Sequence, residues 1–169
     1  PLTIKFDFSP RMVVNKQVKI LQIGSSENKN IEKLIEASKG EKDKLILVRQ
    51  KNEKIQSALE RLDIDYEWHT NVSDNELFGL YKKCDVVFFA STYEGFGLPI
   101  LEAQKVGRPV ITSNISSMPE VVNNHRVLVN PYSSEEIRNK ICEITSSDGL
   151  YQDIVNKGLE NCKHFHPSV

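Results

Sequence analysis

The chain has 169 residues, of which 39% are hydrophobic and 27% are charged, and its formal net charge is -1. This length and composition are typical of a globular protein with one domain and a full hydrophobic core. The nearly balanced charge gives no overall field that would attract nucleic acid or an acidic membrane. No apolar run approaches the roughly 20 residues that a membrane-spanning helix needs.

The three cysteines, Cys84, Cys142 and Cys162, are widely spaced and odd in number. This pattern indicates free thiols in a reducing compartment rather than a disulfide framework or a zinc site. The histidines of the C-terminal third show no metal-ligand spacing among themselves, so we expect no metal site.

Residues 1–17 show no steady hydrophobic period and contain Pro10. We interpret this segment as a lead-in or interdomain linker. The chain begins with Pro1 rather than methionine, which suggests that it is a piece of a longer protein. A regular rhythm of strand-like and helix-like segments then runs over residues 18–166, which we interpret as one Rossmann-like domain.

Residues 18–166 alternate between apolar runs typical of strands and helical spacing of apolar residues. In chain order the pattern predicts a strand at 18–24, a helix at 29–40, a strand at 43–50, a helix at 52–63, a strand at 65–70, a helix at 73–84, a strand at 85–91, a helix ending near 106, a strand at 108–114, a helix at 117–122, a strand at 125–130, and helices at 133–145 and 149–165. Ser73 followed by Glu76 predicts a capping box. The run at 85–91 is the most apolar, so we expect it at the centre of the sheet.

Alternating strands and helices with apolar strands predict parallel βαβ units. About six strands in one open sheet make a doubly wound α/β domain of the Rossmann-like kind. In such sheets the ligand lies outside the carboxyl ends of the strands. The polar residues that follow the strands are therefore the candidates for a functional site.

The first strand is followed by "GSSENKN" at residues 24–30. Gly24 allows a tight turn, Ser25 and Ser26 offer hydroxyls, and Lys29 lies near the start of the next helix. A helix N-terminus beside a lysine suits a phosphate group. An ordinary turn with a surface lysine has the same pattern, and the stretch is neither G-x-G-x-x-G nor a Walker P-loop, so support for NAD or ATP is lacking.

The fourth strand is followed by "STYEGFGLPILEA" at residues 91–103. Glu94 lies just past the strand and Glu102 lies in the following helix, with a glycine turn between them. Carboxylates at this spacing could reach opposite ends of one extended ligand, and they accept hydrogen bonds from vicinal hydroxyls such as those of sugars. A loop acid and a surface helix acid with no shared ligand would have the same spacing.

A longer stretch around these acids carries a family resemblance. "YEGFGLPILEAQKVGRPVITSNISSMPEVV" at residues 93–122 resembles the donor-binding half of the retaining, nucleotide-sugar-dependent glycosyltransferases of family 4, which have the GT-B fold. The match includes the E-x7-E signature from Glu94 to Glu102, the strand "GRPVITS" at 107–113 and the helix "PEVV".

The resemblance extends to both sides of that stretch. "IGSSENKNIEKLIEA" at 23–37 resembles the family's first Rossmann turn with its lysine, and "VLVNPYSSEEI" at 127–137 is similar to the family's "LLVDP" segment. The likeness therefore covers residues 18–165, nearly the whole chain. It implies the C-terminal, donor-binding half of a GT-B glycosyltransferase.

For the sugar end of a donor, the resemblance implies a catalytic role for Glu94, which would hold the sugar hydroxyls near the reacting carbon. The N–H groups of Gly95, Phe96, Gly97 and Leu98 would approach the sugar and the diphosphate. Enzymes of this family are generally metal-independent, so the resemblance implies no cofactor beyond the UDP-sugar or GDP-sugar substrate.

For the nucleotide end, the resemblance implies that Glu102 holds the ribose hydroxyls and that Asn71 and Val72 lie near the base. Lys29 would neutralise the diphosphate leaving group, which is the electrostatic contribution that such a transfer most needs.

The first turn, Gly24 and Ser25, belongs to the same implied donor-binding set, and here the sequence departs from the family pattern. The family often has an arginine directly after the first-strand glycine, where this chain has Ser25, and a glycine pair after the second strand, where this chain has Arg49 and Gln50. The phosphate could therefore be bound by Lys29 alone, or Arg49 could replace the missing arginine.

Enzymes of this fold have a second, N-terminal domain that binds the acceptor, and the reaction takes place between the two. We therefore expect a hexosyltransferase whose acceptor domain is missing from this chain, and we expect the chain alone to be inactive. A sugar-nucleotide-binding domain without transferase activity and a GT-B nucleotide-sugar epimerase are the alternatives. The longer enzyme would act in the cytoplasm in cell-envelope polysaccharide synthesis, and its acceptor domain could attach it peripherally to the inner face of the membrane.

Overall fold

The computed structural model describes residues 4–11 and 17–165. Its centre is a sheet of six strands in the order β3-β2-β1-β4-β5-β6, and every neighbouring pair is parallel. The strands are β1 (Lys19–Ile23), β2 (Lys44–Val48), β3 (Asp65–His69), β4 (Val86–Phe89), β5 (Val110–Ser113) and β6 (Leu128–Val129). This order confirms the predicted doubly wound α/β fold.

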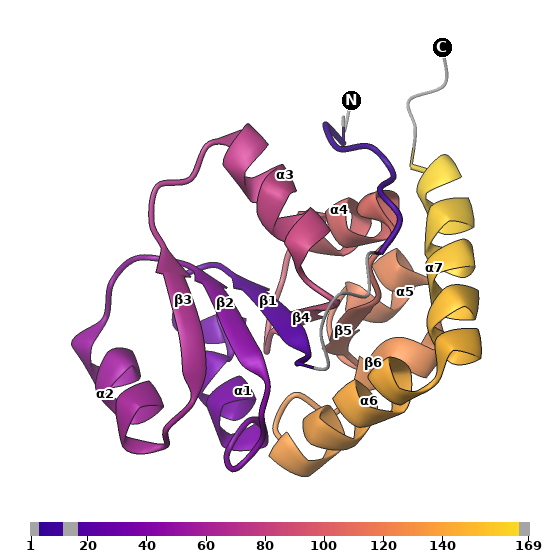
Figure 1. Ribbon diagram of the computed structural model, residues 1–169. Coiled ribbons are helices and arrows are strands. Elements are labelled where there is room, and N and C mark those ends of the chain that lie inside the picture. The colour runs from indigo at the N-terminus through magenta and orange to yellow at the C-terminus, as the bar shows by residue number, and fades with distance from the viewer. Residues whose placement is uncertain (1–3, 12–16, 166–169) are drawn as a thin grey trace.

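Helices cover both faces of the sheet, as Figure 1 shows. The helices are α1 (Ile31–Ala37), α2 (Glu53–Arg61), α3 (Asp74–Lys83), α4 (Leu98–Val106), α5 (Met118–Val122), α6 (Ser134–Ser146) and α7 (Asp148–Lys163), with 3-10 turns η1 (Glu27–Lys29) and η2 (His125–Val127). Helices α1 and α2 lie on one face, and α3 and α4 lie on the other. Helix α6 packs on α1, and α7 packs on α4.

Strand β4 lies inside the sheet between β1 and β5, which confirms the expectation from its composition. All four of its residues are buried, because both faces of an inner parallel strand are covered by helices. The predicted capping box of α3 is also present: Ser73 Oγ accepts from the Glu76 N–H at 3.3 Å, and the Glu76 carboxylate accepts from the Ser73 N–H at 2.6 Å.

The helix expected over residues 29–40 begins later than the hydrophobic spacing suggests. Asn30 has a left-handed backbone with φ of 61°, and such a residue cannot continue a right-handed helix. The chain therefore makes the separate 3-10 turn η1, with Lys29 as its last residue, before α1 starts at Ile31. Asn30 is anchored by its side chain, which donates to the main-chain oxygens of Ala90 at 2.9 Å and Pro131 at 2.7 Å.

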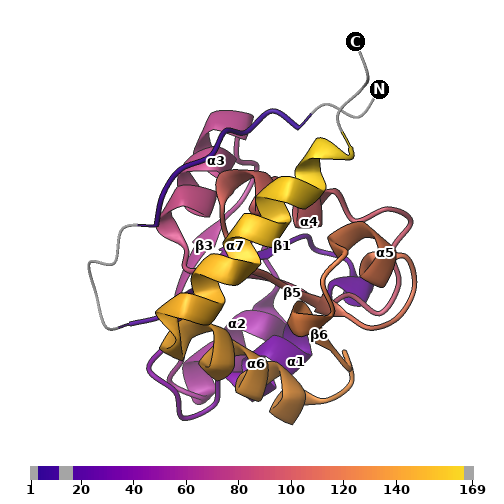
Figure 2. The ribbon, with the colours of Figure 1, turned by 90° about the vertical axis from the view of Figure 1, so that its right-hand side faces the viewer.

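Residues 4–11 lie against the domain, beside α3 (Figure 2). Phe6 is 5% exposed and its ring stacks on Phe78 at a centroid distance of 5.3 Å. The Ser9 N–H donates to the Val106 oxygen at 3.0 Å. This part of the predicted linker thus contributes to the hydrophobic core, while residues 1–3 and 12–16 lie outside the described residues and the boundary near residue 17 stays a prediction.

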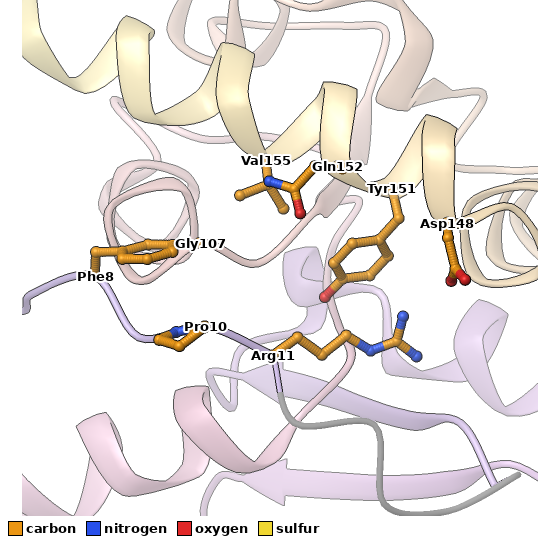
Figure 3. Close-up of a pocket in the computed structure, with 8 residues that line it drawn as sticks. All are labelled: Phe8, Pro10, Arg11, Gly107, Asp148, Tyr151, Gln152 and Val155. Carbon is orange, nitrogen blue, oxygen red and sulfur yellow. The ribbon is translucent and has the colours of Figure 1, made fainter.

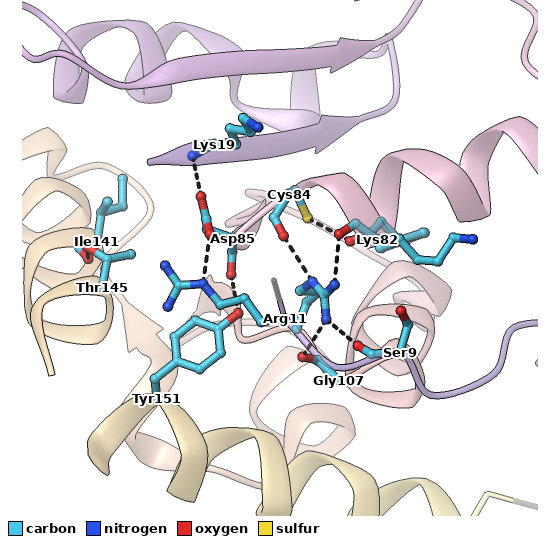
Figure 4. A network of polar contacts seen from close by, with 12 residues as sticks. Ser9, Arg11, Lys19, Lys82, Cys84, Asp85, Gly107, Ile141, Thr145 and Tyr151 are labelled. Carbon is cyan, nitrogen blue, oxygen red and sulfur yellow. Dashed lines mark hydrogen bonds and ion pairs between the residues drawn. The ribbon is translucent and has the colours of Figure 1, made fainter. Parts of the chain in front are cut away.

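The amino ends of the inner strands carry a buried polar network, shown in Figure 4. Arg108 is 1% exposed and its guanidinium donates to the main-chain oxygens of Cys84 at 2.9 Å, Lys82 at 2.8 Å and Ser9 at 2.7 Å. We call this end of the sheet the amino edge and the opposite end, where the strands finish, the carboxyl edge.

Asp85 completes the network of the amino edge. Its carboxylate accepts from Arg11 Nε and from the Lys19 N–H, both at 2.8 Å, and its main-chain oxygen accepts from the Tyr151 hydroxyl at 2.6 Å. Burial raises the pKa of the Cys84 thiol to about 12, so this thiol is neutral at physiological pH.

Among the described helices, none is long and apolar enough to cross a membrane.

Candidate functional site

The loops that leave the strands at the carboxyl edge are joined to one another in the order of the strands. Gln50, after β2, donates from Nε2 to Oδ1 of Asn71, after β3, at 3.0 Å. The Gln50 N–H donates to Oγ of Ser25, after β1, at 2.8 Å. The predicted donor residues Ser25 and Asn71 are therefore linked through Gln50, a residue to which the sequence pattern assigns no role.

The loops after β1 and β4 are also joined. The Thr92 N–H donates to the Asn28 oxygen at 2.9 Å, and Asn28 Nδ2 donates to the Tyr93 oxygen at 2.7 Å. Between these contacts, the ammonium group of Lys29 forms an ion pair with Oε1 of Glu94. The two side chains that the sequence assigns to phosphate and to sugar are thus in direct contact.

The side chain of Lys29 passes close to Gly24, in the turn that precedes it. A Cβ atom at Gly24 would lie 2.9 Å from Cγ and Cε of Lys29, and Gly24 has φ of 105°. Only glycine allows both the close approach of Lys29 and the positive φ without strain, because it has no Cβ and adopts positive φ freely. The ammonium nitrogen of Lys29 also lies 4.7 Å from the centroid of the Phe89 ring, a cation–π distance.

The main chain of Glu94 is fixed by two serines that follow β5. Ser116 Oγ donates to the Glu94 oxygen at 3.0 Å and lies 3.4 Å from the Glu94 nitrogen. Ser117 Oγ donates to the same oxygen at 3.2 Å. Ser116 holds a left-handed backbone with φ of 60°, which is uncommon for serine. Both residues are absent from the sequence-based prediction, although their place after a strand at the carboxyl edge is a signal that points to them.

The glycine turn leads directly into α4. Gly97 caps the helix with φ of 84°, and a Cβ there would lie 3.1 Å from Cδ1 of Ile100. The N-terminus of α4 therefore opens at the carboxyl edge. Pro99 has no N–H and the Ile100 N–H donates to the Gly97 oxygen at 2.9 Å, so an anion there would bind the N–H groups before them, such as that of Leu98. Gly95 and Leu98 are exposed. The ring of Phe96 packs edge-on against Phe165 at 6.0 Å, so Phe96 can serve a ligand through its main chain.

Glu102 lies on the side of α4 that faces α3. Its Oε2 accepts from the Tyr81 hydroxyl at 2.8 Å, and Tyr81 is fully buried. Burial raises the pKa of Glu102, and the Tyr81 hydrogen bond partly opposes this shift. The two acids of the signature thus have different neighbours, since Glu94 contacts the loop after β1. The sequence-based prediction also lacks Tyr81.

Asn71 and Val72, the two residues predicted to lie near the base, differ in exposure. Asn71 is exposed, which leaves it accessible to a ligand. Val72 is partly buried and packs against the hydrophobic core.

Arg49 is nine-tenths buried, with 6% of its surface exposed. Its Nη2 donates to the Ser25 oxygen at 3.0 Å, whereas its Nε and Nη1 have no hydrogen-bond partner among the described residues. Burial lowers the pKa of the guanidinium. Arg49 therefore places a positive charge next to the turn at Ser25, where the sequence predicts that it could replace the family's arginine. Its contact with that turn is to the main-chain oxygen of Ser25.

A separate cavity of about 220 Å³ lies at the amino edge. Figure 3 shows Phe8, Pro10 and Arg11 of the N-terminal segment facing side chains of α7 across it. Its lining residues are Phe8, Pro10, Arg11, Gly107, Asp148, Tyr151, Gln152 and Val155. None of the predicted donor-binding residues belongs to this cavity, so the candidate site and the cavity are at opposite ends of the sheet.

A parallel α/β sheet with a lysine, a helix N-terminus and two carboxylates at its carboxyl edge defines a Rossmann-like domain with a candidate anion-binding site. The family model of the group 1 glycosyl transferases matches residues 5–161. The chain therefore belongs to the group 1 glycosyl transferases.

Individual relatives agree with this family. The chain is 33% identical over 94 residues to the serotype-specific mannosyltransferase WbdA of Escherichia coli, a match that covers 56% of this chain and 12% of WbdA. It is 37% identical over 94 residues to the O-antigen chain mannosyltransferase B of the same species, covering 56% of this chain and 25% of that protein. The matched region is thus at most a quarter of either relative's length.

Solved structures share the fold. The C-terminal domain of the group 1 glycosyl transferase LpcC from Francisella tularensis has a TM-score of 0.74 and 24% identity, over 87% of this chain and 85% of that one. Anabaena HepE, solved in complex with UDP and glucose, has a TM-score of 0.76 and 22% identity, over 88% of this chain and 44% of that one. At these identities the likeness establishes the fold alone.

Proposed function

We propose that this chain is the donor-binding domain of a retaining glycosyltransferase that moves a sugar from a UDP-sugar or GDP-sugar to an acceptor. The observation that carries the proposal is the contact between Lys29 and Glu94 at the carboxyl edge, beside the N-terminus of α4. A cation and a helix N-terminus suit a diphosphate, and an adjacent carboxylate suits sugar hydroxyls. Both chemistries are needed within a few ångströms to bind a nucleotide-sugar.

The roles of the individual residues are those that the family resemblance implies. Lys29 stabilises the negative charge that develops on the diphosphate as the sugar leaves. Glu94 accepts hydrogen bonds from the sugar and stabilises the positive charge that develops at the anomeric carbon. Glu102 accepts hydrogen bonds from the ribose, and Asn71 lies toward the base. No metal ion takes part in this scheme, so we expect EDTA to leave transfer by the longer, two-domain enzyme unchanged.

The relatives supply the biological setting of the proposal. WbdA and the O-antigen chain enzyme are mannosyltransferases, which favours a mannose or a similar hexose as the sugar. We propose that the enzyme takes part in cell-envelope polysaccharide synthesis on the cytoplasmic side of the membrane. The acceptor would lie on a second domain, because holding both reactants together supplies much of the rate enhancement.

Calorimetric titration of the chain with UDP, GDP and ADP tests the proposal. We expect binding of UDP or GDP, and we expect Lys29→Ala to weaken it about tenfold, in line with the loss of a charge-assisted hydrogen bond. Uridine or guanosine, which lack the diphosphate, should bind both proteins equally.

Lys33→Ala is the matched control, since Lys33 lies on α1 and pairs with Glu36 at 2.7 Å. It should leave nucleotide binding unchanged. Equal losses for the nucleoside and the nucleoside diphosphate in Lys29→Ala would show that Lys29 acts through folding. No binding of any of the three nucleotides would contradict the proposed function.

A further inference from the structure

Lys29 and Glu94 neutralise each other in the free protein, although the proposed function assigns them to different groups of the donor. Nζ of Lys29 contacts Oε1 of Glu94, and only 19% and 12% of the two side chains are exposed. Asn28 Nδ2 lies 3.3 Å from the same oxygen. A shielded pair of this kind is screened less by water and salt than a surface pair.

The two loops that carry the pair are joined, because the Thr92 N–H donates to the Asn28 oxygen at 2.9 Å. The absence of a Cβ at Gly24 leaves room for the stem of Lys29 to reach Glu94. The main chain of Glu94 is bound by the hydroxyls of Ser116 and Ser117. A ligand that uses Lys29 must therefore bind with the Glu94 carboxylate next to it.

The nearby Glu94 carboxylate affects the binding of the nucleotide-sugar and of the nucleoside diphosphate differently. A nucleoside diphosphate competes with the Glu94 carboxylate for the Lys29 ammonium, and a shielded carboxylate that loses its partner is left uncompensated. The terminal phosphate of the nucleoside diphosphate also carries about one more negative charge at neutral pH than it does with a sugar attached. In the nucleotide-sugar, by contrast, sugar hydroxyls can donate to Glu94 and replace the hydrogen bond that it received from Lys29.

We propose that Glu94 discriminates the sugar-bearing donor from the spent nucleoside diphosphate by competing for Lys29. This inference rests on the proposed function and adds a second role for Glu94: it weakens binding of the product once the sugar has left. The carboxylate thus favours product release as well as the binding of the donor sugar.

The test is a double-mutant cycle in which the chain is titrated with UDP and GDP and with UDP-glucose and GDP-mannose. Glu94→Gln keeps the size of the side chain and removes its charge. We expect this variant to bind the nucleoside diphosphate about three- to tenfold more tightly than the wild type, the range for a partly shielded charge pair. Its affinity for the nucleotide-sugar should not rise. In the Lys29→Ala background the gain should shrink to below about twofold, because the two residues act as a pair.

Glu27→Gln is the matched control, because Glu27 is an exposed acid two residues before Lys29. It removes the same charge nearby and should change the affinity less than about twofold. If Glu94→Gln binds the diphosphate no better than the wild type, or if Glu27→Gln gains as much, the competition between Glu94 and the diphosphate is contradicted while the proposed function stands. If the wild type binds no nucleoside diphosphate, both fail.

Discussion

At the amino edge of the sheet, the guanidinium of Arg108 donates to the main-chain oxygens of Ser9, Lys82 and Cys84. At the carboxyl edge, the ammonium of Lys29 meets the carboxylate of Glu94 and the ring of Phe89. Both edges contain shielded charges. They differ in the groups that satisfy these two cations, which are fixed main-chain oxygens for Arg108 and replaceable side chains for Lys29.

This difference distinguishes a structural network from a candidate binding site. Main-chain oxygens are positioned by the fold, so a ligand could displace Arg108 only by leaving them unsatisfied, which is costly in a buried setting. A side-chain pair such as Lys29 and Glu94 can exchange partners, since a diphosphate and a sugar hydroxyl provide the same kinds of contact. We therefore expect substitutions at the amino edge to change stability, and substitutions at the carboxyl edge to change binding.

The largest effect is expected for Arg108→Ala. Removal of a buried cation that satisfies several main-chain oxygens should lower the free energy of unfolding by about 3–5 kcal/mol. Urea-induced unfolding measures this loss. Arg126→Ala is the control, because Arg126 is 57% exposed and pairs with Asp153 at the surface, where such a pair contributes at most about 1 kcal/mol. A loss below about 1 kcal/mol in Arg108→Ala would show that the amino-edge network is not structural.

The framework of the fold follows from local patterns in the sequence. The inner strand β4 is apolar because both its faces are covered, and Ser73 with Glu76 forms a capping box, as their spacing predicts. Helix α1 begins later than the hydrophobic spacing predicts. That spacing shows which face of a helix is buried, but it does not show that Asn30 has a left-handed backbone. The packing of Phe6 could not be predicted, because a single aromatic residue in a segment without hydrophobic periodicity gives no sign of whether it is buried.

The candidate site could be predicted as a set of positions but not as a set of contacts. Lys29 and Glu94 follow neighbouring strands, so their shared edge follows from the strand order. Their direct pairing depends on loop geometry that no periodicity encodes. Ser116 and Tyr81 were missed for the same reason, because each touches a signature glutamate more than twenty residues away in the sequence.

An intermediate effect is expected for Glu102→Gln, which sharpens the comparison because Glu102 is partly buried yet belongs to the carboxyl edge. Glutamine can still accept from Tyr81 but loses the charge, so nucleotide affinity should fall by about 1–3 kcal/mol, as for a lost charge-assisted hydrogen bond. Calorimetry with the bare nucleotide measures this change. An unchanged affinity would remove Glu102 from the site.

The same variant has a defined pH dependence. Burial raises the pKa of Glu102 in the folded protein, so the stability that its neutral form provides is present below its unfolded pKa and is lost as pH rises through the folded pKa. Glu102→Gln should therefore melt at a higher temperature than the wild type at pH 7, with a smaller difference near pH 4. Wild-type affinity should fall with decreasing pH as Glu102 takes up its proton, and the affinity of the variant should not show this step. If Glu102→Gln were less stable than the wild type at pH 7, burial of the charged Glu102 carboxylate would not be destabilising.

The smallest effect is expected for Ser116→Gly, which separates stability from binding within one residue. Glycine adopts the left-handed conformation of Ser116 more readily, so the free energy of unfolding should stay equal or rise by less than about 1 kcal/mol. The hydrogen bond from the hydroxyl to the Glu94 oxygen is lost, so the nucleotide-sugar should bind about two- to fivefold more weakly, the range for one neutral hydrogen bond. The bare nucleotide should be affected less than about twofold, because the hydroxyl positions Glu94, the residue that we propose to face the sugar.

Asn123→Gly provides the control, since Asn123 is also left-handed, with φ of 47°, at the end of α5. It should gain stability in the same way and leave the binding of both ligands unchanged. Equal weakening of nucleotide and nucleotide-sugar by Ser116→Gly would mean that the hydroxyl supports the whole edge rather than Glu94.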